Sequence, residues 1–137
     1  MKISNCEGQF MYIITQEMKN KIQEMDKKNF KQWDYLKKAI PRIVHWSKKN
    51  NCKIYNIECV PIFGEELDIL IFYKTNLELE MFKTKKITDL TKKEFITILE
   101  EIGYTTEFNN NIRINFDSDE NVQKNYQGNY GLRLYGD

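Results

Sequence analysis

Carboxylates in the middle of the sequence could do chemistry if the fold brings them together. Glu58, Asp68 and Glu78 lie in three successive segments whose apolar and polar residues alternate. Clustered carboxylates bind Mg²⁺ or act as a general acid and base, so these residues are the candidates for a metal-dependent hydrolase or nuclease. A sheet with one face in solvent shows the same alternation without any function, and we favour that interpretation. Asp68 is singled out because a charge among apolar neighbours requires a hydrogen bond or a functional role.

Arginine and tyrosine recur near the end of the sequence, where they could form a binding surface. Arg113 alternates with apolar residues in 112–116, and Arg133 does so in 130–135, so two strands are predicted with their arginines on the polar side. If these strands pair, the two guanidiniums share a face and favour a nearby anion or a partner's carboxylates. Ordinary surface decoration is the competing interpretation. Arginine and tyrosine dominate binding hot spots, so the candidate partner- or anion-binding residues are Arg113, Arg133, Tyr126, Tyr130 and Tyr135.

The remaining polar motifs predict no cofactor. Asp117 and Asp119 begin a segment that starts like a calcium loop, but its sixth and twelfth positions lack the required glycine and acid. His45 is the only histidine, so most catalytic mechanisms with an imidazole base are excluded unless His45 itself is the base. The three cysteines form no CxxC pair and are interpreted as small apolar side chains in a reducing compartment. No apolar run is long enough to cross a bilayer, so the protein is predicted to be cytoplasmic, without a membrane partner.

Charge is divided unevenly along the chain, although the whole protein carries only +1. Eleven basic residues against four acids make 17–53 basic, whereas six acids against one lysine make 54–82 acidic. This division predicts one basic and one acidic surface, which suits electrostatically steered protein recognition. The basic helices, with Trp33 among their lysines, could instead bind nucleic acid through phosphates and base stacking. The near-neutral total charge and the predicted burial of Trp33 argue against nucleic acid.

Length and composition predict one folded domain over residues 1–137. A chain of 137 residues with 41% hydrophobic and 13% aromatic residues can bury a substantial core. The apolar segment 9–15 predicts a first strand. Two helices follow, over 18–25 and 30–46, because apolar residues recur there at spacings of three and four. Pro41 predicts a kink or a break in the second helix, since proline lacks a backbone donor.

Further strands and a capped helix complete the predicted elements. Three strands of an antiparallel meander are predicted at 53–60, 67–73 and 77–82. The second of these is the most apolar and is predicted to lie in the centre. Thr91 and Glu94 match a capping box, so a helix is predicted to begin there and to end at Gly103. The last segments predict a strand, a short helical turn and a final strand at 112–116, 117–126 and 130–135.

The predicted fold is α+β, with an antiparallel β-sheet and the N-terminal helices and a central helix packed on one face. The absence of catalytic and nucleotide-binding motifs favours a small, non-enzymatic domain that binds another protein. Lys-, Asn- and Ile-rich composition is typical of an AT-rich genome. By class-level analogy with such bacteria and their phages, the function is predicted to be neutralisation of another protein, as in immunity proteins, antitoxins or phage inhibitors. The alternatives are the metal-dependent hydrolase or nuclease and the nucleic-acid-binding protein.

Overall fold

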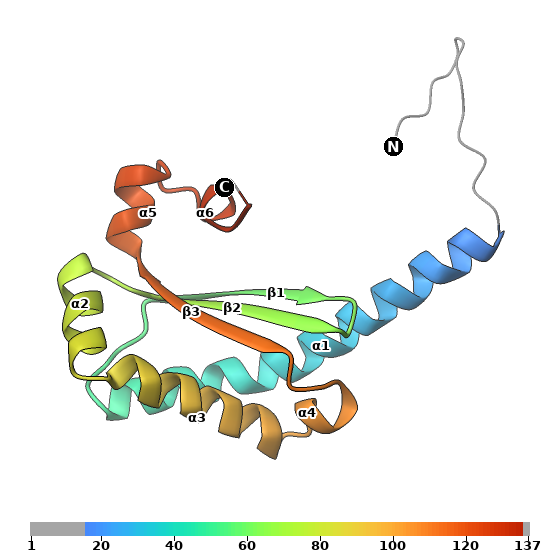
Figure 1. Ribbon diagram of the computed structural model, residues 1–137, viewed down its shortest axis with the longest axis horizontal. Coiled ribbons are helices and arrows are strands. Elements are labelled where there is room, and N and C mark those ends of the chain that lie inside the picture. Colours follow the sequence, from blue (N-terminus) through green and yellow to red (C-terminus); the bar gives the residue numbers. More distant parts are fainter. Residues whose placement is uncertain (1–15, 136–137) are drawn as a thin grey trace, which may run out of the picture.

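The computed structural model describes residues 16–135, so the predicted strand at 9–15 lies outside the described residues. The chain has an α+β fold, as predicted (Figure 1). Helices and strands follow each other along the chain as α1 Gln16–Lys49, β1 Asn56–Ile62, β2 Glu66–Tyr73, α2 Asn76–Thr84, α3 Ile87–Glu101, α4 Tyr104–Glu107, β3 Ile112–Ser118, α5 Asp119–Asn125 and α6 Tyr130–Tyr135. None of the described helices combines the length and the apolar character needed to cross a membrane.

The sheet is mixed, so the prediction of a purely antiparallel sheet was wrong. Its strands lie in the order β1-β2-β3, with β2 in the centre as predicted. β1 and β2 form an antiparallel hairpin, whereas β2 and β3 are parallel. A parallel pair needs a long crossover connection, and here the chain passes through α2, α3 and α4 before β3 begins. The alternation of apolar and polar residues could not reveal this direction, because both pairings use extended backbone.

The main core lies between the first face of the sheet and helices α1 and α3, which run below the sheet in Figure 1. Alternate residues of β2 supply the sheet side of this core because successive side chains of a strand point to opposite faces. Phe95, Ile98 and Leu99 of α3 are buried there, as the helical spacing predicted. Gly103 follows α3 with a φ of 97°, a left-handed conformation in which glycine carries no Cβ penalty. The predicted end of this helix is therefore confirmed.

α1 is one helix of 34 residues with Pro41 inside it, so the two predicted helices are continuous and no break occurs at Pro41. Leu36, Ala39 and Ile43 are fully buried on either side of the proline, whose own position is exposed. Packing of these residues against the core holds the helix together across the missing hydrogen bond. The prediction that Trp33 is buried was also wrong, since 38% of its surface is exposed.

A side-chain N-cap is present in the chain, but not where the capping box was predicted. Thr91 is buried within α3, and its hydroxyl donates to the carbonyl of Ile87 one turn earlier. The capping residue is Thr75 at the start of α2, where its Oγ1 accepts a hydrogen bond from Glu78 N at 3.1 Å. The Glu78 carboxylate in turn accepts from Lys74 N at 3.2 Å. The segment predicted as a third strand at 77–82 is therefore a helix, and its buried residues are spaced by three, at Leu79 and Phe82.

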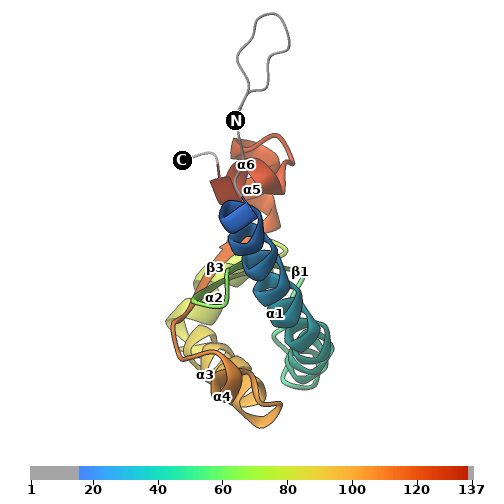
Figure 2. The same cartoon turned by 90° about the vertical axis from the view of Figure 1, so that its right-hand side faces the viewer.

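The second face of the sheet carries α5 and α6, so helices do not cover only one face. Figures 1 and 2 show both helices on the side of the sheet opposite α3. Phe72 and Leu70 of β2 pack there against Val122 of α5. The predicted final strand at 130–135 is the helix α6 instead, and it contributes Tyr130 and Leu134 to the same small cluster. The two helices cover only part of this face.

A candidate functional site: the groove between α6 and the sheet

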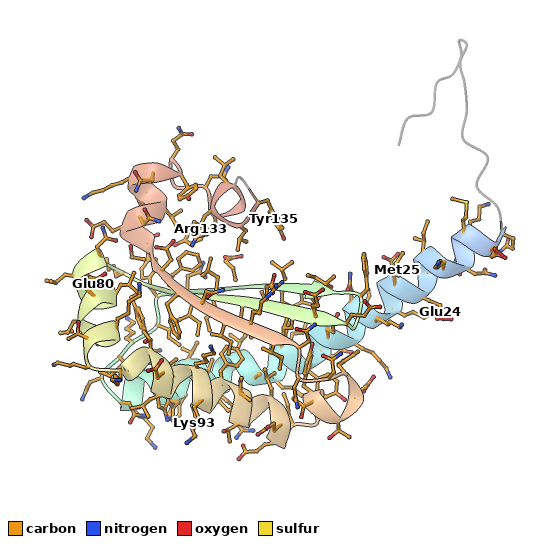
Figure 3. The ribbon with its side chains drawn as sticks, viewed as in Figure 1. Glu24, Met25, Glu80, Lys93, Arg133 and Tyr135 are labelled. Carbon is orange, nitrogen blue, oxygen red and sulfur yellow. The ribbon has the colours of Figure 1, made fainter. Side chains whose placement is uncertain are left out.

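An open groove lies where α6 leaves the second face of the sheet uncovered. Its volume is about 520 Å³. All three strands and α6 contribute side chains, and Figure 3 shows Arg133 and Tyr135 extending from α6 on the side that faces the sheet. The residues that line the groove are Val60, Ile62, Asp68, Ile69, Leu70, Arg113, Asn115, Arg133, Leu134 and Tyr135.

Strand register brings the polar residues of the groove together. Asp68 in β2 lies beside Val60 of β1 and beside Arg113 of β3. Residues at neighbouring register positions point to the same face of a sheet, so all three side chains belong to the second face. The parallel β2–β3 pairing thus decides which arginine meets Asp68, and no feature of the sequence alone indicated that pairing.

Arg113 forms a bidentate ion pair with Asp68. Arg113 Nε lies 2.7 Å from Asp68 Oδ1, and Nη2 lies 3.0 Å from Oδ2. Nη2 also donates to Glu66 Oε1 at 3.1 Å. The hydrogen bond and the charge of Asp68 raise the pKa of Arg113 above its ordinary value. Asp68 was predicted to have either a hydrogen bond or a functional role, and the hydrogen bonds to Arg113 satisfy the first alternative. Two carboxylates already neutralise this guanidinium.

Arg133 joins α6 to the end of β3 through an ion pair with Asp117. Asp117 is only 7% exposed, and its carboxylate also accepts from Ser118 N at 2.7 Å and from Asn121 Nδ2 at 3.0 Å. A buried carboxylate is stable only with such partners. These bonds therefore hold the α6 wall of the groove in place. The charge of Arg133 is balanced by its ion pair with Asp117.

The predicted tyrosines divide between lining the groove and supporting it. Tyr135 lines it and is 71% exposed. Tyr130 lies behind the wall, packed edge-to-face on Phe72 at 4.8 Å between ring centroids, and its hydroxyl donates to Asp119 at 2.5 Å. Burial, followed by this hydrogen bond, raises the pKa of Tyr130. Tyr126 packs in the same cluster, with its ring centroid 5.9 Å from the Arg133 guanidinium.

The prediction that Arg113 and Arg133 share one face of two paired strands was wrong. They do not come from two paired strands, because 130–135 is helical. They line the groove from opposite sides, one on β3 and one on α6. Each is paired with an acid, so the argument for a bound anion between two unpaired guanidiniums no longer holds.

The second sheet face carries more acids than arginines, although the groove itself is lined by Asp68 alone against Arg113 and Arg133. Four carboxylates lie on this face against the two arginines, and they belong to Glu58, Glu66, Asp68 and Asp117. The sequence analysis missed the contributions of Glu66 and Asp117, together with the apolar residues Val60, Ile62 and Leu134. The alternation in β1 and β3 was visible, but the position of α6 above them was not.

The three candidate metal ligands are not brought together. The Glu58 carboxylate accepts from Asn56 Nδ2 at 2.8 Å, and Asp68 is bound to Arg113. Glu78 lies on α2 instead of a sheet strand and caps that helix. Within residues 16–135, no three His, Cys, Asp or Glu side chains are grouped so that they could hold a metal ion.

No protein-family model, curated protein or solved structure significantly matches this chain. Its function is therefore inferred from its own geometry.

Proposed function

We propose that the protein is a small, non-enzymatic domain that binds another protein, and that the groove beside α6 receives a basic segment of that partner. The observation that carries the proposal is an open groove with apolar lining residues, on a sheet face where four carboxylates outnumber two arginines. Val60, Ile62, Leu70 and Leu134 supply apolar area, which is the main source of favourable free energy in protein association.

The exposed ring of Tyr135 adds the type of side chain that dominates interface energetics. Tyrosine offers a large, rigid surface at low entropic cost, and it is enriched among binding hot spots. Tyr135 is the last described residue of α6 and stands at the mouth of the groove. An apolar side chain of the partner could therefore pack between Tyr135 and the apolar lining residues.

The charges on this sheet face determine the charge of the partner segment that it would attract. On this sheet face four carboxylates outnumber two paired guanidiniums, which favours lysine and arginine over the anion or partner carboxylates considered from the sequence. Opposite charges steer the encounter and raise its rate more than they raise final affinity. The part of α1 that packs in the main core lies on the other side of the sheet (Figure 2).

Neutralisation of another protein, as immunity proteins, antitoxins and phage inhibitors do, remains the functional class that we favour by analogy. Such a protein acts by occupying its partner's surface, which requires a binding groove and no catalytic groups. The cytoplasmic location stays a prediction.

Two synthetic peptides test the proposal. Both carry the central pair Leu-Phe, flanked on each side by two lysines in the first and by two glutamates in the second. Nuclear magnetic resonance of the ¹⁵N-labelled protein should show shift changes with the lysine peptide, concentrated at Arg113–Asn115 and Arg133–Tyr135. The glutamate peptide should cause none in the same concentration range.

Tyr135→Ala should weaken binding of the lysine peptide, and Leu90→Ala is the matched control because Leu90 is an exposed apolar residue on α3, outside the groove. Equal binding of the two peptides, or shift changes that avoid the groove, would contradict the proposal.

A further inference from the structure

The N-terminal part of α1 projects beyond the rest of the molecule as an arm, defined here as residues 16–28. Figures 1 and 2 show it leaving the layer of helices below the sheet. Asn29 marks its base, because Asn29 Oδ1 accepts a hydrogen bond from Phe63 N at 2.7 Å in the β1–β2 turn. An arm of this length extends about 20 Å at the usual helical rise.

One seam of mostly apolar residues, interrupted by Asn29 and Gln32, runs along α1 from the arm into the core. Its members alternate at spacings of four and three, at Met18, Ile22, Met25, Asn29, Gln32, Leu36, Ala39 and Ile43. This is the heptad pattern with which one helix packs against another. The last four members are fully buried where α1 packs against α3 and the sheet. The seam of the arm is therefore a direct continuation of an interface that already holds this fold together.

The seam remains accessible on the arm. Ile22 is 46% exposed and Met18 is 51% exposed, while Met25 is half-buried. Figure 3 shows Met25 and Glu24 extending from different sides of the arm, as expected for a helix with one apolar side. The same stripe packs against the rest of the fold in the second half of α1. Its accessible part on the arm is therefore suited to binding another helix.

The residues beside the seam determine the charge of that helix. Lys21 and Lys28 are seven residues apart and flank the seam on one side, while Lys19 and Asp26 flank it on the other. Three lysines against one aspartate favour a partner with acidic residues at its own flanking positions.

A second copy of the arm fits these charges less well. The body of the molecule lies at the carboxyl end of the arm (Figure 1), so two copies could avoid each other only in antiparallel orientation. That orientation sets the side with Lys21 and Lys28 against the same side of the other copy, where like charges repel, and on the other side it sets Lys19 against Asp26. An acidic helix can instead pair with all three lysines.

We propose that the arm is a second docking surface, separate from the groove, and that it binds an acidic amphipathic helix of another protein. The partner helix packs its apolar seam on Ile22 and Met25, and its glutamates or aspartates pair with Lys19, Lys21 and Lys28.

The test uses the full chain and two labelled 21-residue peptides as probes. Both have leucine at every a and d position of three heptads; one has glutamate and the other lysine at every e and g position. Fluorescence anisotropy should show binding of the glutamate peptide, weaker binding at high salt because the paired charges are screened, and at least about tenfold weaker binding of the lysine peptide.

Substitutions in the arm locate the contact. Ile22→Gln should abolish binding of the glutamate peptide while leaving the circular dichroism spectrum unchanged. Lys21→Glu should weaken binding about fivefold, since it replaces flanking attraction by repulsion. Lys27→Glu is its matched control, because Lys27 lies on the side of the helix away from the seam and the change in net charge is identical.

Three results would overturn the proposal. The first is no binding of the glutamate peptide, and the second is equal binding of both peptides. The third is a doubled mass of the chain alone in light scattering, removed by Ile22→Gln, because it would assign the seam to a second copy.

Discussion

Gln32 provides the sharpest test of how α1 is attached to the rest of the fold. It is a polar residue at a seam position of α1, and it is fully buried. Its Nε2 donates to Tyr104 Oη at 2.9 Å and to the carbonyl of Glu66 at 3.0 Å. Its Oε1 accepts from Gly64 N at 2.8 Å. One amide side chain thus joins α1 to α4 and to the β1–β2 turn.

Gln32→Met removes these bonds while nearly keeping the side-chain volume. Three net hydrogen bonds contribute about 3 kcal/mol, and the extra apolar surface of methionine offsets about 1 kcal/mol of that loss. We therefore expect the free energy of unfolding to fall by about 2 kcal/mol. With a urea m-value of about 1.5 kcal/mol/M, the unfolding midpoint should drop by roughly 1 M.

Urea titration followed by circular dichroism measures this shift. Gln23→Met is the matched control, because Gln23 is an exposed residue of the same helix and should change stability by less than about 0.5 kcal/mol. Combining Gln32→Met with Tyr104→Phe should give less than the sum of the two separate losses, since the variants share one hydrogen bond. A midpoint for Gln32→Met that matches the Gln23→Met control would refute the reasoning.

Two further predictions concern helix capping and thiol reactivity. Thr75→Ala should lower the free energy of unfolding by about 1 kcal/mol through the lost cap on α2. Glu94→Ala should change the free energy of unfolding by less than about 0.5 kcal/mol, because α3 has no side-chain cap. A larger loss in the urea midpoint for Glu94→Ala than for Thr75→Ala would contradict the assignment. Burial raises the pKa of Cys59 from 9.0 to about 12, so its alkylation by iodoacetamide at pH 8, followed by mass spectrometry, should be about a thousandfold slower than that of a free thiol. Because the folded-state pKa is the higher one, the stability that Cys59 contributes is complete below pH 9 and is lost as the pH rises towards 12. Cys59 is half-buried, and rapid alkylation at pH 8 would contradict the raised pKa.

Several elements could be predicted from local pattern alone. β2 is a long run of β-branched and aromatic residues, and β3 alternates cleanly from Ile112 to Phe116, so both were found. In α3 the spacing of Phe95, Ile98 and Leu99 identifies the buried side, and Gly103 identifies the end. In each case neighbouring residues alone determine the periodicity or the special backbone conformation.

The short apolar segments could not be assigned in the same way. Residues 77–82 and 130–135 contain too few residues to separate a period of 2 from a period of 3.6. The first has its N-cap at Thr75, with a glutamate three residues later, but the capping signal was assigned to Thr91 instead. The second is helical where it packs over Phe72, a contact between residues about sixty positions apart.

Both candidate binding surfaces depend on such distant contacts. The sequence identified Arg113, Arg133 and Tyr135 as residue types suited to binding, and it predicted two amphipathic helices where the structure has α1. It did not reveal that Arg113 pairs with Asp68, that Arg133 reaches the groove from a helix, or that the seam of α1 is buried at one end and accessible at the other. Local patterns specify backbone conformation and the side of an element that is apolar. Strand direction, charge pairing and the area left uncovered arise from packing between segments far apart in the chain, and these are what make a groove and an arm.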